Sequence, residues 1–494
     1  MSTGSESAMT FMVESVADTT AEEVDSIVEA AAGAAGPWAG MALADRARVL
    51  SGIADRLDAH AAELIPLAML ETHLAQPRLA GELKRTSFQL RMFAQLVLDG
   101  GFLDVRIDRA DADWPMGAPR PDLRRMNIPL GPVLNFAASN FPFAFSVAGG
   151  DTASALAAGC PIIVKANPGH PALSRAVGRL LDEVIAECGA PRGTFGMVFG
   201  RDAGVRALLH PAVAAAAFTG STAGGRALYD LACGRPVPIP FYGELGSINP
   251  VFVTAEAARA RAAEIAAGLL IAVSSSAGQL CTKPGLVAVP EGSPLLAELI
   301  RTAPVPTGEM LNDQIADGFT RAVEQVRAHP DVRVLTGGGP GEALLLATTA
   351  RAVLSDRDRL MREMFGPATL LVSYRDTAEL LELARSVQGE LTVSIFGEHA
   401  DDTTRALLTA GAGAAGRVLW NSWPTGLSVT YAQQHGGPYP ATTAPATTSV
   451  GTAAITRFLR PVVFQSVPDQ LLPPQLRTEN PLGVPRSLNG ALAQ

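Results

Sequence analysis

The sequence predicts an α/β protein in which strands and helices alternate through most of the chain. From Gly131 onward, short apolar runs alternate with longer helical segments, which is the pattern of a mainly parallel sheet. Apolar residues make up 48% of the 494 residues and aromatic residues only 5%, which suits helices that pack closely through small side chains. A chain of this length has room for two or three domains.

Three helices and a hairpin precede the alternating region. Helical spacing of apolar residues, with a Thr cap before a Glu-rich first turn, predicts helices over residues 20–35, 43–74 and 80–98. Two strands follow at 102–107 and 123–128, separated by a stretch rich in Pro and Asp. Such a hairpin is either an arm that reaches a neighbouring subunit or an edge ribbon.

The alternating region predicts a sheet with a ligand at one edge. Its strands are predicted over residues 133–136, 161–166, 195–199, 213–218, 237–242 and 250–253. Helices are predicted between them over 145–158, 173–188, 204–209 and 223–233. Ligands of such sheets bind at the carboxyl ends of the strands. Lys165, Gly220 and Ser221 all lie at such ends.

A second α/β unit is predicted from about residue 245 to residue 440. Its strands are expected at residues 286–289, 369–372, 393–396 and 418–420. After residue 447 the chain has one strand-like run, at 462–465, and then Pro-rich coil. We expect this extended tail to dock on another surface.

Charge and cysteine spacing exclude several classes of protein. The formal net charge of −9 gives no reason to expect a nucleic acid or an acidic membrane as partner. The N-terminus shows no secretory signal, and no apolar run is long enough to span a membrane, so a soluble, cytoplasmic protein is expected. Neither a disulfide framework nor a metal site is predicted, because no C-x-x-C pair occurs among the cysteines, Cys160, Cys188, Cys233 and Cys281.

The stretch VSSSAGQLCTKPG around Cys281 is a candidate nucleophile turn. Its small hydroxylic residues and glycines disfavour helix, so we expect an exposed turn between an Ala-rich helix and a strand. Backbone N–H groups in such a turn can bind an oxyanion and favour the thiolate. A lone cysteine is nevertheless more often buried and unreactive, so the interpretation depends on the rest of the chain.

Four other segments fit the same chemistry. The stretch from Thr219 to Gly225, at a strand-to-helix junction, is a candidate dinucleotide contact, although an ordinary capped helix has the same pattern. Glu244, Asn140 and Glu363 each follow a predicted strand or lie in a turn. Taken singly, each of these three is an unremarkable loop residue.

Together these segments resemble the aldehyde dehydrogenase superfamily over nearly the whole chain. The matching segments, in order, are SNFPF, PIIVKANP, FTGST, GELG, GQLCT, EMFGP and VLWN. Within the superfamily the chain looks most like the α-ketoglutarate semialdehyde (2,5-dioxovalerate) dehydrogenases and their fatty-aldehyde relatives. The distinguishing stretches are residues 145–164, SINP at 247–250 and HGGPYPATT at 435–443.

The resemblance implies a fold and an assembly. It implies a Rossmann-type cofactor domain over residues 1–101 and 129–244 and an α/β catalytic domain over 245–445. A small β oligomerisation arm would be formed by residues 102–128 and 446–494. A homodimer or homotetramer is therefore expected.

The resemblance also implies a role for each candidate residue. Cys281 would add to the aldehyde to form a thiohemiacetal, with the Asn140 side chain and the Cys281 backbone N–H as oxyanion hole. Hydride transfer would leave a thioester, which water activated by Glu244 would hydrolyse. The predicted cofactor contacts are Lys165, Asn167, Gly220, Ser221, Glu363 and Phe365.

The residue three positions after Lys165 indicates the cofactor. Many NAD-preferring relatives carry Glu there, whereas this chain has Pro168. Without that carboxylate a 2′-phosphate is not repelled and can pair with Lys165. We therefore expect NADP, with NAD as the alternative; related semialdehyde dehydrogenases often have His where this chain has Asn167.

The substrate is left open between two kinds of aldehyde. A dicarboxylic semialdehyde needs a partner for its distal carboxylate, and Arg85, Gln89 and Arg91 lie on one predicted helix. A fatty aldehyde needs an apolar tunnel, for which the candidates are Phe88, Met92, Phe93 and Phe145. His435 is interpreted as a structural residue of a Gly/Pro turn.

The prediction is an NADP-dependent aldehyde dehydrogenase that converts 2,5-dioxopentanoate to 2-oxoglutarate. A fatty aldehyde dehydrogenase is the alternative with the same mechanism. Transfer of the acyl group to coenzyme A is disfavoured, since Glu244 supplies a base for water. A catalytically silent binding or structural protein is the alternative of another class, and the presence of Cys281, Glu244 and Asn140 argues against it.

Overall fold

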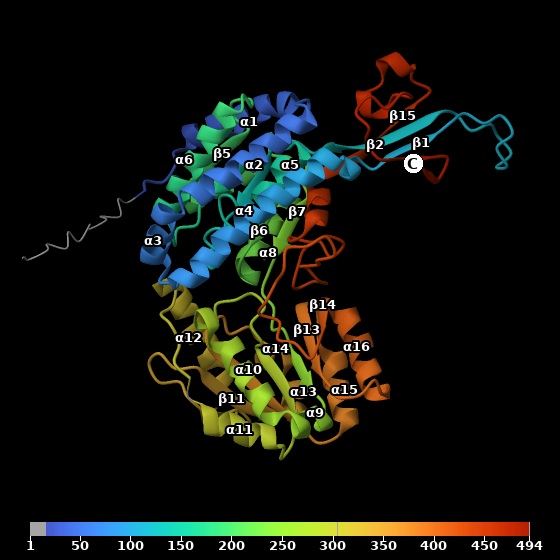
Figure 1. Ribbon diagram of the computed structural model, residues 1–494. Helices are drawn as coiled ribbons and strands as arrows, with labels where there is room; N and C mark the ends of the chain where they lie inside the picture. The colour runs from blue at the N-terminus through green and yellow to red at the C-terminus, as the bar shows by residue number, and fades with distance from the viewer. Residues whose placement is uncertain (1–15, 304, 494) are drawn as a thin grey trace, which may run out of the picture.

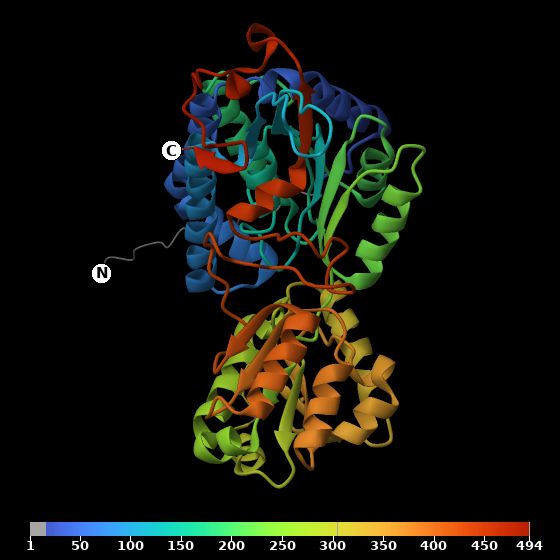
Figure 2. The ribbon, with the colours of Figure 1, turned by 90° about the vertical axis from the view of Figure 1, so that its right-hand side faces the viewer.

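The computed structural model describes residues 16–303 and 305–493, which form three β-sheets and their helices (Figure 1). Residues 1–15, on which the expected lack of a secretory signal depends, lie outside these ranges. Two α/β bodies lie one above the other in Figure 1, and a β arm projects from the upper body. Figure 2 shows the chain that follows the last strand of the lower body crossing back to the upper body. No described helix is long and apolar enough to cross a membrane.

The upper body is built on five parallel strands in the order β5-β4-β3-β6-β7. The strands are β3 (Val133–Phe136), β4 (Ile162–Lys165), β5 (Phe195–Val198), β6 (Ala215–Thr219) and β7 (Phe241–Glu244). The helices are α1 (Ala21–Ala39), α2 (Leu43–Ala59), α3 (Ala61–Thr72), α4 (Gln76–Asp99), α5 (Gly150–Ala158), α6 (Pro171–Glu187), α7 (Arg201–Leu209) and α8 (Thr222–Cys233). The carboxyl ends of β4, β6 and β7 therefore open on one edge, as expected.

The lower body holds a seven-stranded sheet in the order β10-β11-β12-β9-β8-β13-β14, in which only β10 is antiparallel. The strands are β8 (Val251–Val253), β9 (Leu286–Pro290), β10 (Arg333–Thr336), β11 (Leu344–Thr349), β12 (Ala368–Tyr374), β13 (Glu390–Phe396) and β14 (Ala415–Trp420). The helices are α9 (Ala255–Ala260), α10 (Ala262–Ser274), α11 (Pro294–Thr302), α12 (Asp313–Arg327), α13 (Ala350–Ser355), α14 (Arg357–Leu360), α15 (Thr377–Ser386) and α16 (Asp402–Ala414). A short 3₁₀ turn, η2 (Ser275–Gly278), follows α10.

The arm is a third sheet, in the order β15-β2-β1-β16-β17. Its strands are β1 (Val105–Asp108), β2 (Leu123–Pro129), β15 (Leu459–Gln465), β16 (Arg486–Leu488) and β17 (Ala491–Ala493). The predicted hairpin is confirmed as the antiparallel pair β1 and β2. The carboxyl-terminal tail docks as predicted, since β15 pairs with β2 and β16 pairs with β1. We propose these three sheets as the cores of the three predicted domains.

Two predicted helices differ from the observed ones. The helix expected over residues 43–74 is two helices, because His60 ends α2 and its carbonyl accepts the first N–H groups of α3. The helix expected over residues 145–158 begins only at Gly150. The residues before it fold back on themselves, and the Gly150 N–H at the start of the helix donates to the carbonyl of Ala144.

Two predicted strands begin well after the expected residue, and four strands were not predicted. The run over residues 102–107 pairs only from Val105, because Gly101–Leu103 forms a 3₁₀ helix. The run over residues 237–242 pairs only from Phe241 onward, because Pro238 and Pro240 have no N–H to donate to a ladder. The strands β10, β11, β16 and β17 were missed. The strands β10, β16 and β17 lie at or next to a sheet edge and are three or four residues long, so their apolar patterns are weak. The strand β11, LLLATT, begins with a continuous buried apolar run that was not predicted.

Candidate active site

Cys281 follows a strained turn that is packed into the protein. Ser276 and Ala277 both have a φ of 51°, and Gly278 has a φ of 67°, so three consecutive residues are left-handed. A Cβ on Gly278 would lie 2.2 Å from the carbonyl oxygen of Gly366, so only glycine fits there. The expectation of an exposed turn is therefore wrong: the turn is held under the loop between α14 and β12.

Asn249 and Lys283 fix the position of this turn. The Asn249 side-chain amide donates to the carbonyl oxygens of Cys281 at 2.8 Å and Lys283 at 3.1 Å. The buried Lys283 ammonium donates to the carbonyls of Met364 at 2.9 Å and Ala368 at 2.6 Å, and burial lowers its pKa to about 8. Neither role was predicted from the sequence, although Asn249 belongs to the distinguishing stretch SINP.

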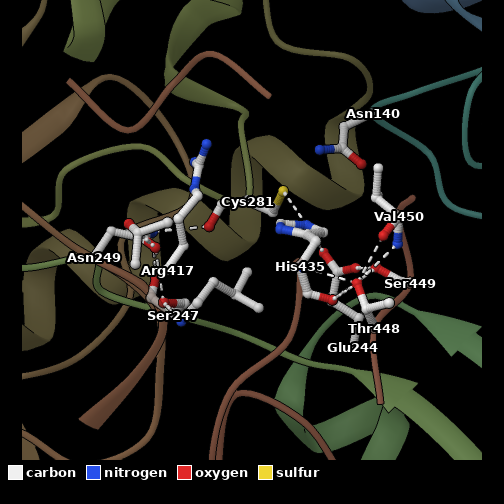
Figure 3. A network of polar contacts seen from close by, with 12 residues as sticks. Asn140, Glu244, Ser247, Asn249, Cys281, Arg417, His435, Thr448, Ser449 and Val450 are labelled. Atoms are coloured by element: carbon white, nitrogen blue, oxygen red, sulfur yellow. Dashed lines mark hydrogen bonds and ion pairs between the residues drawn. The ribbon is translucent and has the colours of Figure 1, made fainter. Parts of the chain in front are cut away.

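His435 lies between Cys281 and Glu244 (Figure 3). Its Nε2 is 3.6 Å from the Cys281 Sγ and 2.9 Å from the Glu244 Oε1. Ser449 donates to the other Glu244 oxygen at 2.7 Å. The interpretation of His435 as only a turn residue is wrong, because tertiary folding brings it to the nucleophile. Its place in the distinguishing stretch HGGPYPATT was the signal available in the sequence.

The pKa values of Cys281 and Glu244 differ from those of exposed side chains. Burial, followed by the neighbouring Glu244 carboxylate, raises the pKa of the Cys281 thiol well above its ordinary value. Burial also acts to raise the pKa of Glu244, but His435 and the hydrogen bond from Ser449 outweigh it, and the pKa is lowered. The expectation that the turn favours the thiolate is therefore wrong. The resting pair is a thiol beside a carboxylate.

Asn140 lies beside the nucleophile turn. Its side-chain Nδ2 donates one hydrogen to the carbonyl of Gln279 at 3.0 Å, and the second hydrogen of the amide is left for another acceptor. The backbone carbonyl of Asn140 accepts a hydrogen bond from the Arg78 guanidinium at 2.8 Å. Within the described residues the backbone N–H of Cys281 has no acceptor. Two N–H groups are thus available near the thiol.

The edge formed by β4 and β6 can hold the phosphates of a dinucleotide. Ser221 caps α8 by accepting from the Gly224 N–H at 3.2 Å, and the Gly220 N–H donates to the Glu244 carbonyl at 3.1 Å. The N-terminus of α8 then faces the carboxyl edge of the sheet, which favours an anion. Lys165 lies at the end of β4, and burial lowers its pKa.

Asn167, a predicted cofactor contact, also holds the loop that follows β4. Its Nδ2 donates to the Ala137 carbonyl at 2.9 Å, and its Oδ1 accepts from the Gly169 N–H at 2.9 Å. Both ends of the amide therefore hold the loop after β4, and the second Nδ2 hydrogen is left for the predicted cofactor contact.

A cavity of about 340 Å³ joins the start of α8 to Glu363. Its lining includes Thr222, Gly246 and Glu363. A Cβ on Gly246 would lie 2.5 Å from the Glu363 Oε2, so glycine lets this carboxylate approach the backbone beside Glu244. Burial raises the pKa of Glu363 to about 7. Phe365 follows two residues later and is half-buried. These residues fit the nicotinamide end of a dinucleotide.

Only one of the three predicted carboxylate partners remains a good candidate. The Arg85 guanidinium lies 5.2 Å from the Phe145 ring centre, and its Nη1 is buried with no hydrogen-bond partner among the described residues. Gln89 is buried against Gly150, at the start of α5. Arg91 lies outside the site. It pairs with two carboxylates of α2, at 2.6 and 2.7 Å, on the surface.

The residues proposed for an apolar tunnel do not all lie together. Phe88 is 53% exposed on the outer face of α4, and Phe93 packs in the main core of the upper body. Met92 and Phe145 form a small apolar cluster with Phe141, Leu427, Val429 and Val450. Phe145 also lies 6.2 Å from the His435 ring, so this cluster borders the nucleophile.

The sequence profile of the aldehyde dehydrogenase family matches residues 8–441. The chain therefore belongs to the aldehyde dehydrogenase family, and it is an oxidoreductase that acts on aldehydes with a nicotinamide dinucleotide. The solved structure of PnpE from Pseudomonas sp. WBC-3 has the same fold, with a TM-score of 0.77, 22% identity and 93% of each chain covered. A second PnpE structure, with a TM-score of 0.78, is a complex with nicotinamide adenine dinucleotide.

Two curated relatives are more similar in sequence than these solved structures, and both are named as dehydrogenases of the same aldehyde. The chain is 44% identical to alpha-ketoglutaric semialdehyde dehydrogenase 2 of Azospirillum brasilense, over 95% of this chain and 91% of that protein. It is 39% identical to the alpha-ketoglutaric semialdehyde dehydrogenase of Acinetobacter baylyi, over 96% of this chain and 92% of that protein.

Proposed function

We propose that this protein oxidises 2,5-dioxopentanoate, which is α-ketoglutarate semialdehyde, to 2-oxoglutarate. The observation that carries this proposal is the Arg85 guanidinium near the nucleophile, whose buried Nη1 has no hydrogen-bond partner among the described residues. A buried donor without an acceptor is costly, and the distal carboxylate of this substrate would supply an acceptor at Nη1. The names of the two curated relatives support the same substrate.

The preferred cofactor in this proposal is NADP, with NAD as the alternative. Lys165 would pair with the 2′-phosphate, since Pro168 stands where a repelling carboxylate could lie. Ser221, Gly220 and the start of α8 would hold the pyrophosphate, and Glu363 with Phe365 would hold the nicotinamide ribose. When bound, the nicotinamide accepts a hydride from the substrate carbon.

Activation of Cys281 is the first chemical task of the residues in the site. Because the thiol has a raised pKa, it needs a proton acceptor before it can attack. Water would take the Sγ proton, and the Nε2–H of His435, which lies 3.6 Å from Sγ and 2.9 Å from Glu244 Oε1, would stabilise the thiolate and keep Glu244 in place. The thiolate then adds to the aldehyde carbon, and the Asn140 and Cys281 N–H groups stabilise the oxyanion. One such donor is worth about 3 kcal/mol.

Hydrolysis of the resulting thioester is the second task. Glu244 would remove a proton from water as its oxygen adds to the thioester carbon, and the Cys281 sulfur would leave and regain a proton. Ser449 keeps Glu244 in place through the oxygen that does not face His435. The products are a carboxylate and the resting thiol.

The alternative substrate is a fatty aldehyde, and the cluster of Met92 and Phe145 is the feature that would favour it. We favour the semialdehyde because a long alkyl chain gives the Nη1 of Arg85 no acceptor. We do not favour a silent binding protein, since binding alone does not require a thiol, an imidazole and a carboxylate in contact. We also propose a cytoplasmic homodimer or homotetramer that assembles through the β arm.

The test is a comparison of kcat/KM for 2,5-dioxopentanoate, succinic semialdehyde and decanal, each with NADP and with NAD. The proposal predicts the highest value for 2,5-dioxopentanoate with NADP. Arg85→Met should raise KM for this substrate about tenfold or more, since an ion pair is lost, and leave decanal nearly unchanged. Arg91→Met is the matched control and should change neither. A preference for decanal in the parent enzyme would contradict the substrate assignment.

A further inference from the structure

Three side chains of the donor types that zinc prefers meet at one point of the active site. The Cys281 Sγ, the His435 Nε2 and a Glu244 carboxylate oxygen all lie within 4.8 Å of one another. Glu244 and His435 are buried, and Cys281 is partly buried. The cysteine spacing predicted no metal site, because the three residues come from segments that lie far apart in the sequence.

The distances suit a tetrahedral ion. With zinc bonds of about 2.3 Å to sulfur and 2.0–2.1 Å to nitrogen, a tetrahedral angle separates the two ligands by about 3.6 Å. The Sγ and Nε2 atoms are 3.6 Å apart. A nitrogen and an oxygen ligand would be about 3.3 Å apart, and Nε2 and Oε1 are 2.9 Å apart. The Glu244 oxygen lies within 4.8 Å of Sγ, against about 3.5 Å in a tetrahedral site, so the carboxylate would move by up to about 1 Å to complete the geometry.

The charges suit the ion as well. A thiolate and a carboxylate together carry two negative charges, which neutralise Zn²⁺. The complex of the ion with its three ligands would therefore have no net charge. Ser449 donates to the Glu244 oxygen that faces away from His435, which leaves Oε1 for the metal. Such support of a ligand by a neighbouring hydrogen bond is typical of metal sites.

We propose that Zn²⁺ binds reversibly to Cys281, His435 and Glu244 in the free enzyme and inhibits it. Coordination forms a bond from Sγ to the metal and releases the thiol proton to solvent, and the proton of Nε2 moves to Nδ1 so that Nε2 can bind. The bound sulfur cannot attack an aldehyde, and the bound carboxylate cannot serve as a base. Zinc and aldehyde therefore exclude each other.

The second nitrogen of His435 makes this an inhibitory site and not a structural one. A ligating histidine usually donates from its other nitrogen, and loss of that partner weakens binding by about 10- to 100-fold. The Nδ1 of His435 is buried and has no partner among the described residues. The zinc is therefore held less tightly than in a structural site and is removed by chelators. Mg²⁺ is excluded, because a thiolate and an imidazole are poor ligands for a hard ion.

The experiment uses Co²⁺ as a coloured substitute for Zn²⁺ in the full-length enzyme without cofactor. We expect one cobalt per chain, with a thiolate-to-cobalt charge-transfer band in the near ultraviolet and the visible bands of a tetrahedral ion. Added Zn²⁺ should displace the cobalt. In turnover assays Zn²⁺ should inhibit competitively with aldehyde, a chelator should restore activity, and millimolar Mg²⁺ should have no effect.

Variants separate this site from chance binding to a thiol. Cys281→Ser should abolish the charge-transfer band, and His435→Asn should weaken cobalt binding by at least about tenfold. Cys233→Ser, which alters an exposed cysteine, is the matched control and should leave the spectrum unchanged. Absence of the band, or its persistence in Cys281→Ser, would overturn the proposal. The spectrum needs no turnover, so its outcome does not depend on which aldehyde is the substrate.

Discussion

At the scale of single residues, the surroundings of Glu244 decide its chemistry. A buried carboxylate is usually protonated more easily than an exposed one, yet His435 and Ser449 keep the pKa of Glu244 below its ordinary value. Glu244 therefore stays ionised and able to accept a proton. The same carboxylate raises the pKa of Cys281, so the nucleophile and its base depend on each other.

Replacement of Glu244 by Gln separates the two chemical steps. If Glu244 activates the hydrolytic water, Glu244→Gln should lower kcat by about 10²- to 10⁴-fold, because general-base catalysis is lost. Stopped-flow absorbance should show a stoichiometric burst of reduced cofactor before the slow phase. Ser449→Ala, which keeps the carboxylate, should show a smaller loss. If no burst precedes the slow phase in Glu244→Gln, Glu244 acts before hydride transfer.

Glu390 predicts a pH-dependent stability. Its Oε2 accepts from the Ser247 hydroxyl and from two backbone N–H groups, and burial raises its pKa to about 7. The folded protein therefore keeps this proton at pH values where the unfolded chain, with an ordinary pKa of 4.5, has lost it. The stability from this group is largest below pH 4.5 and falls as pH rises to 7, by about 3 kcal/mol in total.

Glu390→Gln tests this linkage, because the amide oxygen can accept the same donors without titrating. The Tm of the variant relative to the parent should rise between pH 5.5 and pH 8. Glu382→Gln, on the exposed face of α15, is the control and should show no such trend. Thermal unfolding followed by circular dichroism measures both. A Tm difference that does not change with pH would contradict the assignment.

At the scale of elements, helix α4 connects the parts of the oxyanion site. Arg78 and Glu82 are one turn apart and form a buried ion pair. Arg78 also donates to the Asn140 carbonyl at 2.8 Å and to the Ser276 hydroxyl at 3.0 Å. Glu82 accepts the N–H groups of residues 143 and 144, both at 2.8 Å. One helix thus fixes the position of the Asn140 loop relative to the nucleophile turn.

We expect Glu82→Ala to lower kcat by up to about 100-fold, since small displacements of an oxyanion donor are that costly. The Kd for NADP, measured by fluorescence, should stay nearly unchanged. Glu82→Gln should recover part of the rate, because its amide oxygen still accepts the two N–H groups. Lys84→Ala, on the exposed face of the same helix, should have no effect. Equal losses of cofactor affinity and rate would indicate general unfolding instead.

At the scale of the whole molecule, the β arm presents apolar side chains to solvent. Val463 of β15 is 52% exposed, Leu471 is 74% exposed and Leu492 is 87% exposed. The sheet also ends in two strands, β15 and β17, that have no neighbour on their outer side among the described residues. Apolar side chains at an open sheet edge are typical of a subunit contact.

Light scattering after size exclusion should give a mass of two or four chains of 51.3 kDa. Val463→Asp combined with Leu471→Asp should shift the mass toward the monomer, because a charge is buried at the contact. Val334→Asp, which alters an exposed apolar residue of β10 in the lower body, is the control. A parent protein that elutes as a single 51.3 kDa chain would contradict the assembly.

The sequence predictions were mostly correct where the structure depends on local patterns and wrong where it depends on contacts between distant segments. The parallel strands β3 to β6 were found because continuous apolar runs are strong local signals. The hidden turn before Cys281 and the pKa of its thiol were not, because both depend on the packing of residues 366 and 244 against it. Arg85 and Arg91 lie on the same helix, yet only the tertiary structure shows that Arg91 is paired on the surface while the Nη1 of Arg85 is buried without a hydrogen bond.

By itself the sequence determined the α/β class, the family, the candidate nucleophile and base, and the hairpin of the arm. Each of these depends on local patterns or on motifs that can be read in order. The tertiary structure alone decided that His435 lies between Cys281 and Glu244, that Asn167 bonds to its own loop, and that the Nη1 of Arg85 is buried without a hydrogen bond. These facts depend on distances between segments far apart in the chain, and such distances are set by packing that no local pattern encodes.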